Sequence, residues 1–169
     1  WLAAACAAPA LALEPPALML ARVYRAGRSL DGFWVSEKLD GVRARWDGER
    51  LVSRGGEQIM APVWFTAGWP ADALDGELWI GRGRFEDTMS TVRRLTPDDD
   101  AWRQVRFMVF DMPSHPGRFT ERVWAMQALA EDEALQQRSQ LLKFTFLLFI
   151  LKRVYAAFKK RCPKRSTEL

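Results

Sequence analysis

The sequence predicts an α+β domain with a mixed or antiparallel sheet and flanking helices. Two stretches of alternating apolar and polar residues, 42–52 and 74–80, predict strands, and helical patterns occupy residues 85–95 and 120–137. The chain has 169 residues, of which 49% are hydrophobic. It is therefore long enough for one ordinary domain with a real core.

A β-hairpin is the clearest local prediction. Residues 42–46 alternate apolar with basic side chains, so Arg43 and Arg45 should point to one face of a strand while the apolar residues pack on the other. Asp-Gly at 47–48 is a hairpin turn signal, and a return strand is expected to start at residues 51–52.

Three further strands are expected. Residues 33–35 predict a strand that enters a polar loop. In residues 74–80 we expect a turn at Asp75-Gly76, followed by alternation that places Glu77 on one face of a second core strand. Residues 105–110 are almost continuously apolar, which is typical of a buried strand, and this strand should end at Asp111.

Helices should cover this sheet. Residues 85–95 have a helical pattern, and Thr96-Pro97-Asp98 can start another short helix. Thr120 is a suitable N-cap for a longer helix that runs to about Gln137.

Both ends of the chain differ from the core. Residues 1–16 are small and apolar like the later part of a secretory signal peptide, which predicts a periplasmic or exported protein, with a cytoplasmic one as the alternative. Cys6 and Cys162 lie near opposite ends and predict no disulfide framework. Residues 140–169 carry eight Lys/Arg and one acidic residue. Their apolar part, 141–151, is too short for a transmembrane helix, which needs ~20 residues.

Four motifs that carry chemistry follow one another in the core. They are K-x-D-G-x-R at residues 38–43, Ser-Arg-Gly-Gly at 53–56, Asp-Gly-Glu-Leu at 75–78 and Phe-Met-Val-Phe-Asp at 107–111. A single K-x-D-G tetrapeptide is a weak signal, because such short motifs occur by chance. The ordered set resembles the covalent nucleotidyltransferase superfamily of DNA ligases, RNA ligases and mRNA capping enzymes.

The residues of these motifs and the leader are most similar to those of minimal, exported, bacterial ATP-dependent DNA ligases, which serve DNA repair, replication and recombination. The resemblance covers residues 20–125. The resemblance implies a partial ATP-grasp-like nucleotidyltransferase (adenylation) domain at residues 17–139, between a leader at 1–16 and an apolar and basic tail at 140–169. Family members normally continue with two further motif strands and an oligonucleotide-binding (OB) domain. None of these motifs follows residue 125, so we expect the domain to be truncated, the OB domain to be absent and activity to be impaired.

The resemblance also implies roles for individual residues. Lys38 would attack the α-phosphate of ATP and carry AMP, which requires its amine to be deprotonated. The ordinary lysine pKa of about 10.4 opposes this unless positive charge lies nearby. The other positions implied at the nucleotide site are Glu37, Asp40 and Gly41 beside the lysine, Arg43 and Arg54 for ribose and phosphate, Glu77 for ribose or metal, and Phe110 for adenine.

The implied cofactors are ATP and Mg²⁺ or Mn²⁺, and the implied partner is nicked double-stranded DNA, bound by a monomer. In many relatives the acid that recognises adenine stands two residues before the lysine, where this chain has Ser36, so the role of Glu37 stays open. Three alternatives remain: an RNA ligase or guanylyltransferase, a non-catalytic module that binds nucleic acid or a membrane surface through the tail, and a nonfunctional product.

Overall fold

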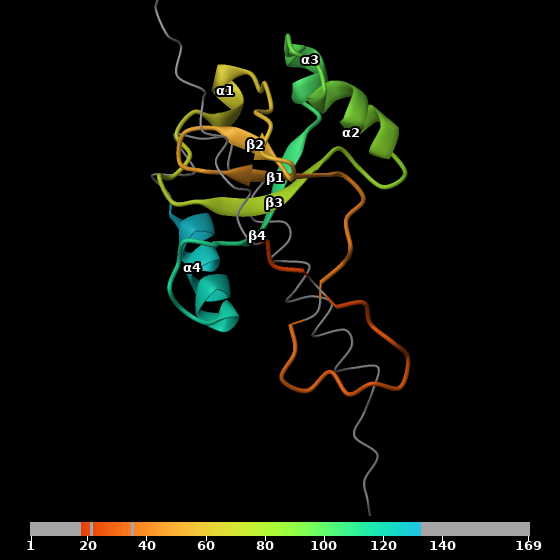
Figure 1. Ribbon diagram of the computed structural model, residues 1–169, viewed down its shortest axis with the longest axis vertical. Coiled ribbons are helices and arrows are strands. Elements are labelled where there is room, and N and C mark those ends of the chain that lie inside the picture. The colour runs from red at the N-terminus through yellow and green to blue at the C-terminus, as the bar shows by residue number, and fades with distance from the viewer. Residues whose placement is uncertain (1–17, 21, 35, 133–169) are drawn as a thin grey trace, which may run out of the picture.

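The computed structural model describes residues 18–20, 22–34 and 36–132 (Figure 1). The leader expected at residues 1–16, both cysteines and the tail expected at 140–169 lie outside the described residues. Among the helices within these ranges, none combines the length and apolar character needed to cross a bilayer.

A four-stranded antiparallel sheet forms the centre of the domain. Its strand order is β2-β1-β3-β4, with β1 at Val42–Trp46, β2 at Leu51–Ser53, β3 at Leu74–Trp79 and β4 at Arg106–Asp111. The two central strands are therefore the predicted first strand of the hairpin and the predicted second core strand. This arrangement confirms the expected α+β class with an antiparallel sheet.

Helices lie on both sides of the sheet. Figure 1 shows α1 (Val63–Thr66), α2 (Phe85–Val92) and α3 (Asp99–Trp102) on one side and α4 (Phe119–Glu131) on the opposite side. The first three helices come from the segments that connect β2, β3 and β4, so one face of the sheet is covered before the chain reaches α4. The helix α1 is not among the elements expected from the sequence.

An aromatic core fills the space between the sheet and helices α1 and α3. The Phe65 and Trp102 rings lie 4.7 Å apart, and Trp69 stacks on Phe107 at 5.0 Å. Trp46 of β1 is 5% exposed and donates its indole N–H to the Pro70 carbonyl at 2.6 Å. Because alternation sends Trp46 into this core, the neighbouring Arg45 must face the other side of the sheet.

Two buried carboxylates face each other across β3 and β4. Asp75 is the register partner of Asp111, and their side chains are 1% and 4% exposed. Like charges opposite each other destabilise a sheet, and each carboxylate here pairs with its own guanidinium. Arg43 binds Asp75 at 2.5 Å, and Arg122 of α4 binds Asp111 at 2.6 Å.

The prediction of a strand at residues 33–35 is wrong at positions 33 and 34, which the structure describes. Phe33 and Trp34 have no regular secondary structure and are 49% and 40% exposed, and residue 35 lies outside the described part. A strand needs a partner for its backbone hydrogen bonds, and the sheet pairings among the described residues do not include this segment. Trp34 instead donates its indole N–H to the Thr120 hydroxyl at 3.1 Å.

Two expected boundaries are also wrong. Asp75 and Gly76 lie inside β3 rather than in a turn, because both are buried and pair with β1 and β4. Thr120 lies inside α4 rather than at its N-cap. The backbone N–H of Arg118, the N-cap residue, donates to the Glu121 carboxylate at 2.6 Å.

Candidate active site

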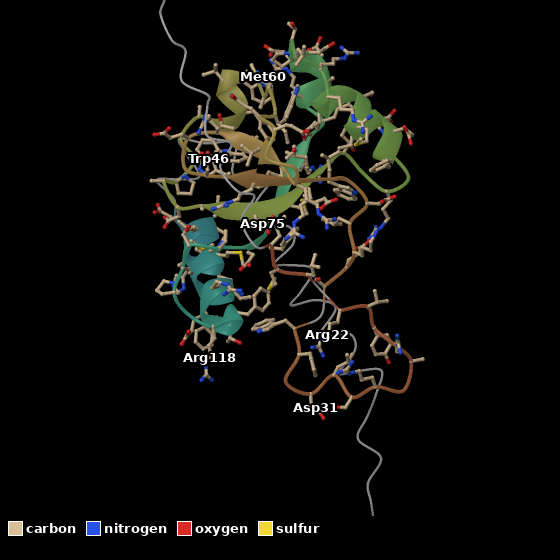
Figure 2. All side chains as sticks on the ribbon, in the orientation of Figure 1. Arg22, Asp31, Trp46, Met60, Asp75 and Arg118 are labelled. Carbon is tan, nitrogen blue, oxygen red and sulfur yellow. The ribbon has the colours of Figure 1, made fainter. Side chains whose placement is uncertain are left out.

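The polar face of β1 and β3 collects most of the predicted site residues. Cross-strand pairing places Arg43 opposite Glu77 and Arg45 opposite Asp75. Alternation turns all four side chains away from the aromatic core. Figure 2 labels Trp46 and Asp75, which lie on opposite faces of the sheet.

Glu77 of β3 contacts the lysine motif. Its Oε1 atom accepts a hydrogen bond from the Gly41 backbone N–H at 3.1 Å. It also interacts electrostatically with Lys38, Asp40 and Arg43. The Gly41–Glu77 hydrogen bond therefore joins the lysine motif to β3 across 36 positions of the sequence.

Gly41 is required where the chain enters β1. A Cβ atom at this position would run into the Leu78 carbonyl oxygen and approach the Glu77 side chain. Only glycine lets the backbone come close enough to β3 to donate its N–H to Glu77. This close approach fixes one end of the segment that carries Lys38.

Arg43 connects the two halves of the site. Its Nε and Nη2 atoms donate to Asp75 at 3.1 and 2.5 Å, and Nη2 also donates to the Met19 carbonyl at 2.8 Å. The guanidinium carbon lies 5.1 Å from the centre of the Phe110 ring, in a cation–π contact. Arg43 therefore contacts Asp75 and Phe110 and lies opposite Glu77 on the neighbouring strand.

A β-bulge brings Phe110 into position. Gly76 pairs with Val109 and Asp75 pairs with Asp111, so Phe110 is the extra residue of β4 at the register shift. Bulges redirect a side chain that simple alternation would send elsewhere. Phe110 is half-buried there, whereas its neighbour Val109 is buried in the core.

Arg54 lies at the other end of the same face. It lines a small pocket together with Arg43, Arg45, Ser53 and Asp75. The Nε atom of Arg45 is buried without a hydrogen-bond partner among the described residues. Asp75 pairs with Arg43 in this pocket, and Arg45 and Arg54 are the other charged side chains that line it.

Glu37 has a partner outside this cluster. Both of its carboxylate oxygens bind Arg82, with contacts of 2.6 to 2.9 Å. Arg82 lies in the turn that follows β3. The structure thus brings Gly41, Arg43, Glu77 and Phe110 together through side-chain contacts and strand pairing, places Arg54 in the pocket beside Arg43, and pairs Glu37 with the turn after β3.

Lys38 is chemically distinct from the other basic residues around it. It is exposed, and it is the only lysine in the first 142 residues, where every other basic side chain apart from His115 is arginine. Arginine stays protonated in proteins and cannot serve as an amine nucleophile. The part of the chain that the structure describes therefore offers one side-chain amine.

Asp75 is the site residue that the sequence analysis missed. Its Asp-Gly dipeptide suggested a turn, which implies an exposed side chain. The signal that could have found it is period-two alternation, because Asp75 and Glu77 fall on the same face of a strand. Its buried carboxylate fixes the orientation of Arg43.

A metal ion at this site would take some of its ligands from the protein and the others from a phosphate substrate and water. No group of three or more His, Cys, Asp or Glu side chains within the described ranges is arranged to hold one. Mg²⁺ commonly uses one or two carboxylates and takes its other ligands from phosphates and water. Glu77, on the polar face of β3, can supply one such carboxylate.

Burial raises the pKa of Glu77 above its ordinary value of 4.5, although the Gly41 N–H, Arg43 and Lys38 lower it. A raised pKa in the folded state favours folding below the unfolded pKa, and this contribution is lost as pH rises through the folded pKa. Ionised Glu77 therefore destabilises the fold at neutral pH. We expect Glu77→Gln to raise the melting temperature at pH 7, with a difference that shrinks towards pH 4.

Melting temperatures from pH 4 to pH 8 test this expectation. Glu49→Gln, at an exposed position in the β1–β2 turn, is the matched control and should show no such trend. The expectation would be contradicted if the melting temperature of Glu77→Gln, measured relative to the parent chain, were lower at pH 7 than at pH 4.

Comparison with known proteins gives two informative similarities. No protein-family model matches the chain. The DNA ligase of Haemophilus influenzae is 37% identical over 111 residues, which make up 66% of this chain and 40% of that protein. A solved structure from a study of DNA binding by Lig E DNA ligases is 49% identical and has a TM-score of 0.62; the match covers 68% of this chain and 45% of that one. The chain spans less than half the length of either relative.

Proposed function

We propose that this chain, a fragment related to the ATP-dependent DNA ligases, carries the residues with which such a ligase binds ATP and attaches AMP to Lys38. The observation that carries the proposal is the polar face of β1 and β3, where Arg43 lies opposite Glu77 and Glu77 accepts a hydrogen bond from Gly41, three residues after Lys38. Sealing of nicked double-stranded DNA would be the later use of the bound AMP. Activity of the whole ligase is part of the proposal, because this chain covers less than half of its relatives.

The first step is a transfer of AMP. The unprotonated amine of Lys38 attacks the α-phosphorus of ATP and forms a P–N bond. The bond between that phosphorus and the bridging oxygen breaks, pyrophosphate leaves with the electron pair, and the amine proton passes to solvent. Lys38 suits this role because it is exposed and is the single side-chain amine in the described residues.

The surrounding residues would hold the nucleotide. Arg43 and Arg54 line one pocket and can bind phosphate or ribose oxygens, since a guanidinium makes paired hydrogen bonds to such groups. Phe110 offers a ring on which adenine can stack, and Asp40 and Gly41 shape the loop. Positioning and charge neutralisation would supply most of the rate enhancement.

A divalent cation, when bound with ATP, would neutralise charge on the phosphates. Glu77 would be its protein ligand, because this carboxylate is bonded to Gly41 at the end of the lysine motif. The Gly41 N–H bonded to Oε1 keeps the Glu77 side chain in this position.

Covalent labelling tests the proposal. The purified 169-residue chain is incubated with Mg²⁺ or Mn²⁺ and ATP labelled at either the α- or the γ-phosphate. We expect label that survives denaturing electrophoresis from α-labelled ATP alone, and its release by added pyrophosphate. A folded chain that takes up no label would refute the assignment, and preferential labelling by GTP would instead indicate a guanylyltransferase.

A further inference from the structure

We propose that the Glu37–Arg82 ion pair is a latch that positions Lys38 for attack, so that Glu37 acts on Arg82 and not on the nucleotide. This inference rests on the proposed function and deepens it by adding two positioning residues to the site. Neither residue would touch the reacting atoms.

The contacts of this pair are specific in geometry. Arg82 donates from Nε to Glu37 Oε1 at 2.9 Å, and from Nη2 to Oε1 and Oε2 at 2.7 and 2.6 Å. The two residues are 45 positions apart, so the pair ties the segment before β1 to the turn after β3. Paired contacts between a planar guanidinium and a carboxylate fix direction as well as distance.

The Lys38 segment has two anchors, one within β3 and one in the turn that follows β3. Residues 36–40 have no regular secondary structure, so no strand or helix pairing orders them. Gly41 is fixed by its N–H bond to Glu77 within β3, and Glu37 is fixed by Arg82 in the turn that follows. Lys38 lies one residue after Glu37 and three residues before Gly41.

The turn that carries Arg82 is itself well defined. The Arg84 N–H donates to the Gly81 carbonyl at 3.4 Å, and Gly83 has a φ of +70°, a backbone conformation that favours glycine. Arg84 in turn binds Asp87 at the start of α2. The guanidinium of Arg82 therefore projects from a turn joined to both β3 and α2.

The Glu37–Arg82 pair should contribute little to the stability of the fold. The Arg82 side chain is 75% exposed, and exposed ion pairs contribute little to the free energy of unfolding. A nucleophile that is displaced by about 1 Å, however, can lose about a hundredfold in rate. The pair should therefore matter for the rate of AMP transfer while leaving the fold almost unchanged.

The first test measures the rate of Lys38 labelling at increasing ATP concentration. We expect Arg82→Ala to lower the rate at saturating ATP about tenfold and to change the half-saturating ATP concentration less than about twofold. Arg82→Lys keeps the charge but loses the paired contacts, so it should recover only part of the rate. The double variant E37R/R82E should label faster than either single reversal.

Arg94→Ala is the matched control. Arg94 is also exposed, at 54%, and pairs with Asp98 at 3.0 Å away from the site. It should leave the labelling rate unchanged. Loss of ATP affinity in Glu37→Gln without loss of the saturating rate, together with failure of the charge reversal to restore activity, would overturn the latch.

Hydrogen exchange of the full chain gives a reading that does not depend on activity. The amide of Gly41, which donates to Glu77, should exchange several-fold faster in Arg82→Ala than in the parent chain, and Arg94→Ala should not differ from it. Unchanged exchange in Arg82→Ala would overturn the inference even if labelling occurs. Faster exchange in a chain that takes up no label would retain the latch and reject the proposed function.

Discussion

Replacing Lys38 with alanine is expected to abolish covalent labelling by α-labelled ATP, with a fall of at least about a thousandfold in the rate. The reason is the absence of a substitute: Lys38 is the only lysine before residue 143, and the arginines around it remain protonated. Lys38→Arg should fail as completely as Lys38→Ala. The measurement is label retained after denaturing electrophoresis.

Lys143→Ala is the control for this variant, because it removes the next lysine along the chain. It should label at the parental rate. Label that persists in Lys38→Ala and disappears in Lys143→Ala would move the nucleophile into the tail and reject the site on β1 and β3. Circular dichroism of both variants would confirm that they are folded.

Replacing Asp75 with asparagine is expected to lower the free energy of unfolding by about 3–5 kcal/mol. Asp75 is 1% exposed and pairs with Arg43, which is 17% exposed, so the substitution leaves a largely buried guanidinium without its counter-charge. Urea denaturation measures the effect. The same variant should lose Lys38 labelling, because Asp75 fixes the direction of Arg43.

Two further variants separate stability from positioning. Arg50→Gln breaks an exposed ion pair with Asp47 and should change stability by less than about 0.5 kcal/mol. Replacing both buried partners, in R43M/D75L, should restore much of the stability and none of the labelling. A D75N variant as stable as the parent chain would show that the pair is not a structural requirement.

Local sequence pattern determined much of this fold. Alternation of apolar and polar residues identified β1 and β3, because the pleat of a strand sends successive side chains to opposite faces, and an almost continuous apolar run identified β4. The same alternation correctly placed Arg43 and Arg45 on one face and Glu77 away from Leu78. The helical pattern at residues 85–95 located α2, although the helix ends at Val92.

Pairing and register were decided only by the tertiary structure. The sequence could not show that Asp75 would lie inside a strand beside Arg43, or that a register shift would make Phe110 the extra residue of a bulge. It also could not show that residues 33 and 34 would lack a strand partner.

The lysine motif illustrates the division between the two. Its residues and their order identified Lys38 as the candidate nucleophile, because only an unprotonated amine can act this way and the other basic side chains nearby are guanidiniums. The contacts that hold the motif, Gly41 to Glu77 and Glu37 to Arg82, join positions 36 and 45 residues apart. Such contacts depend on where β3 and its turn lie relative to β1, and local spacing carries no information about that distance.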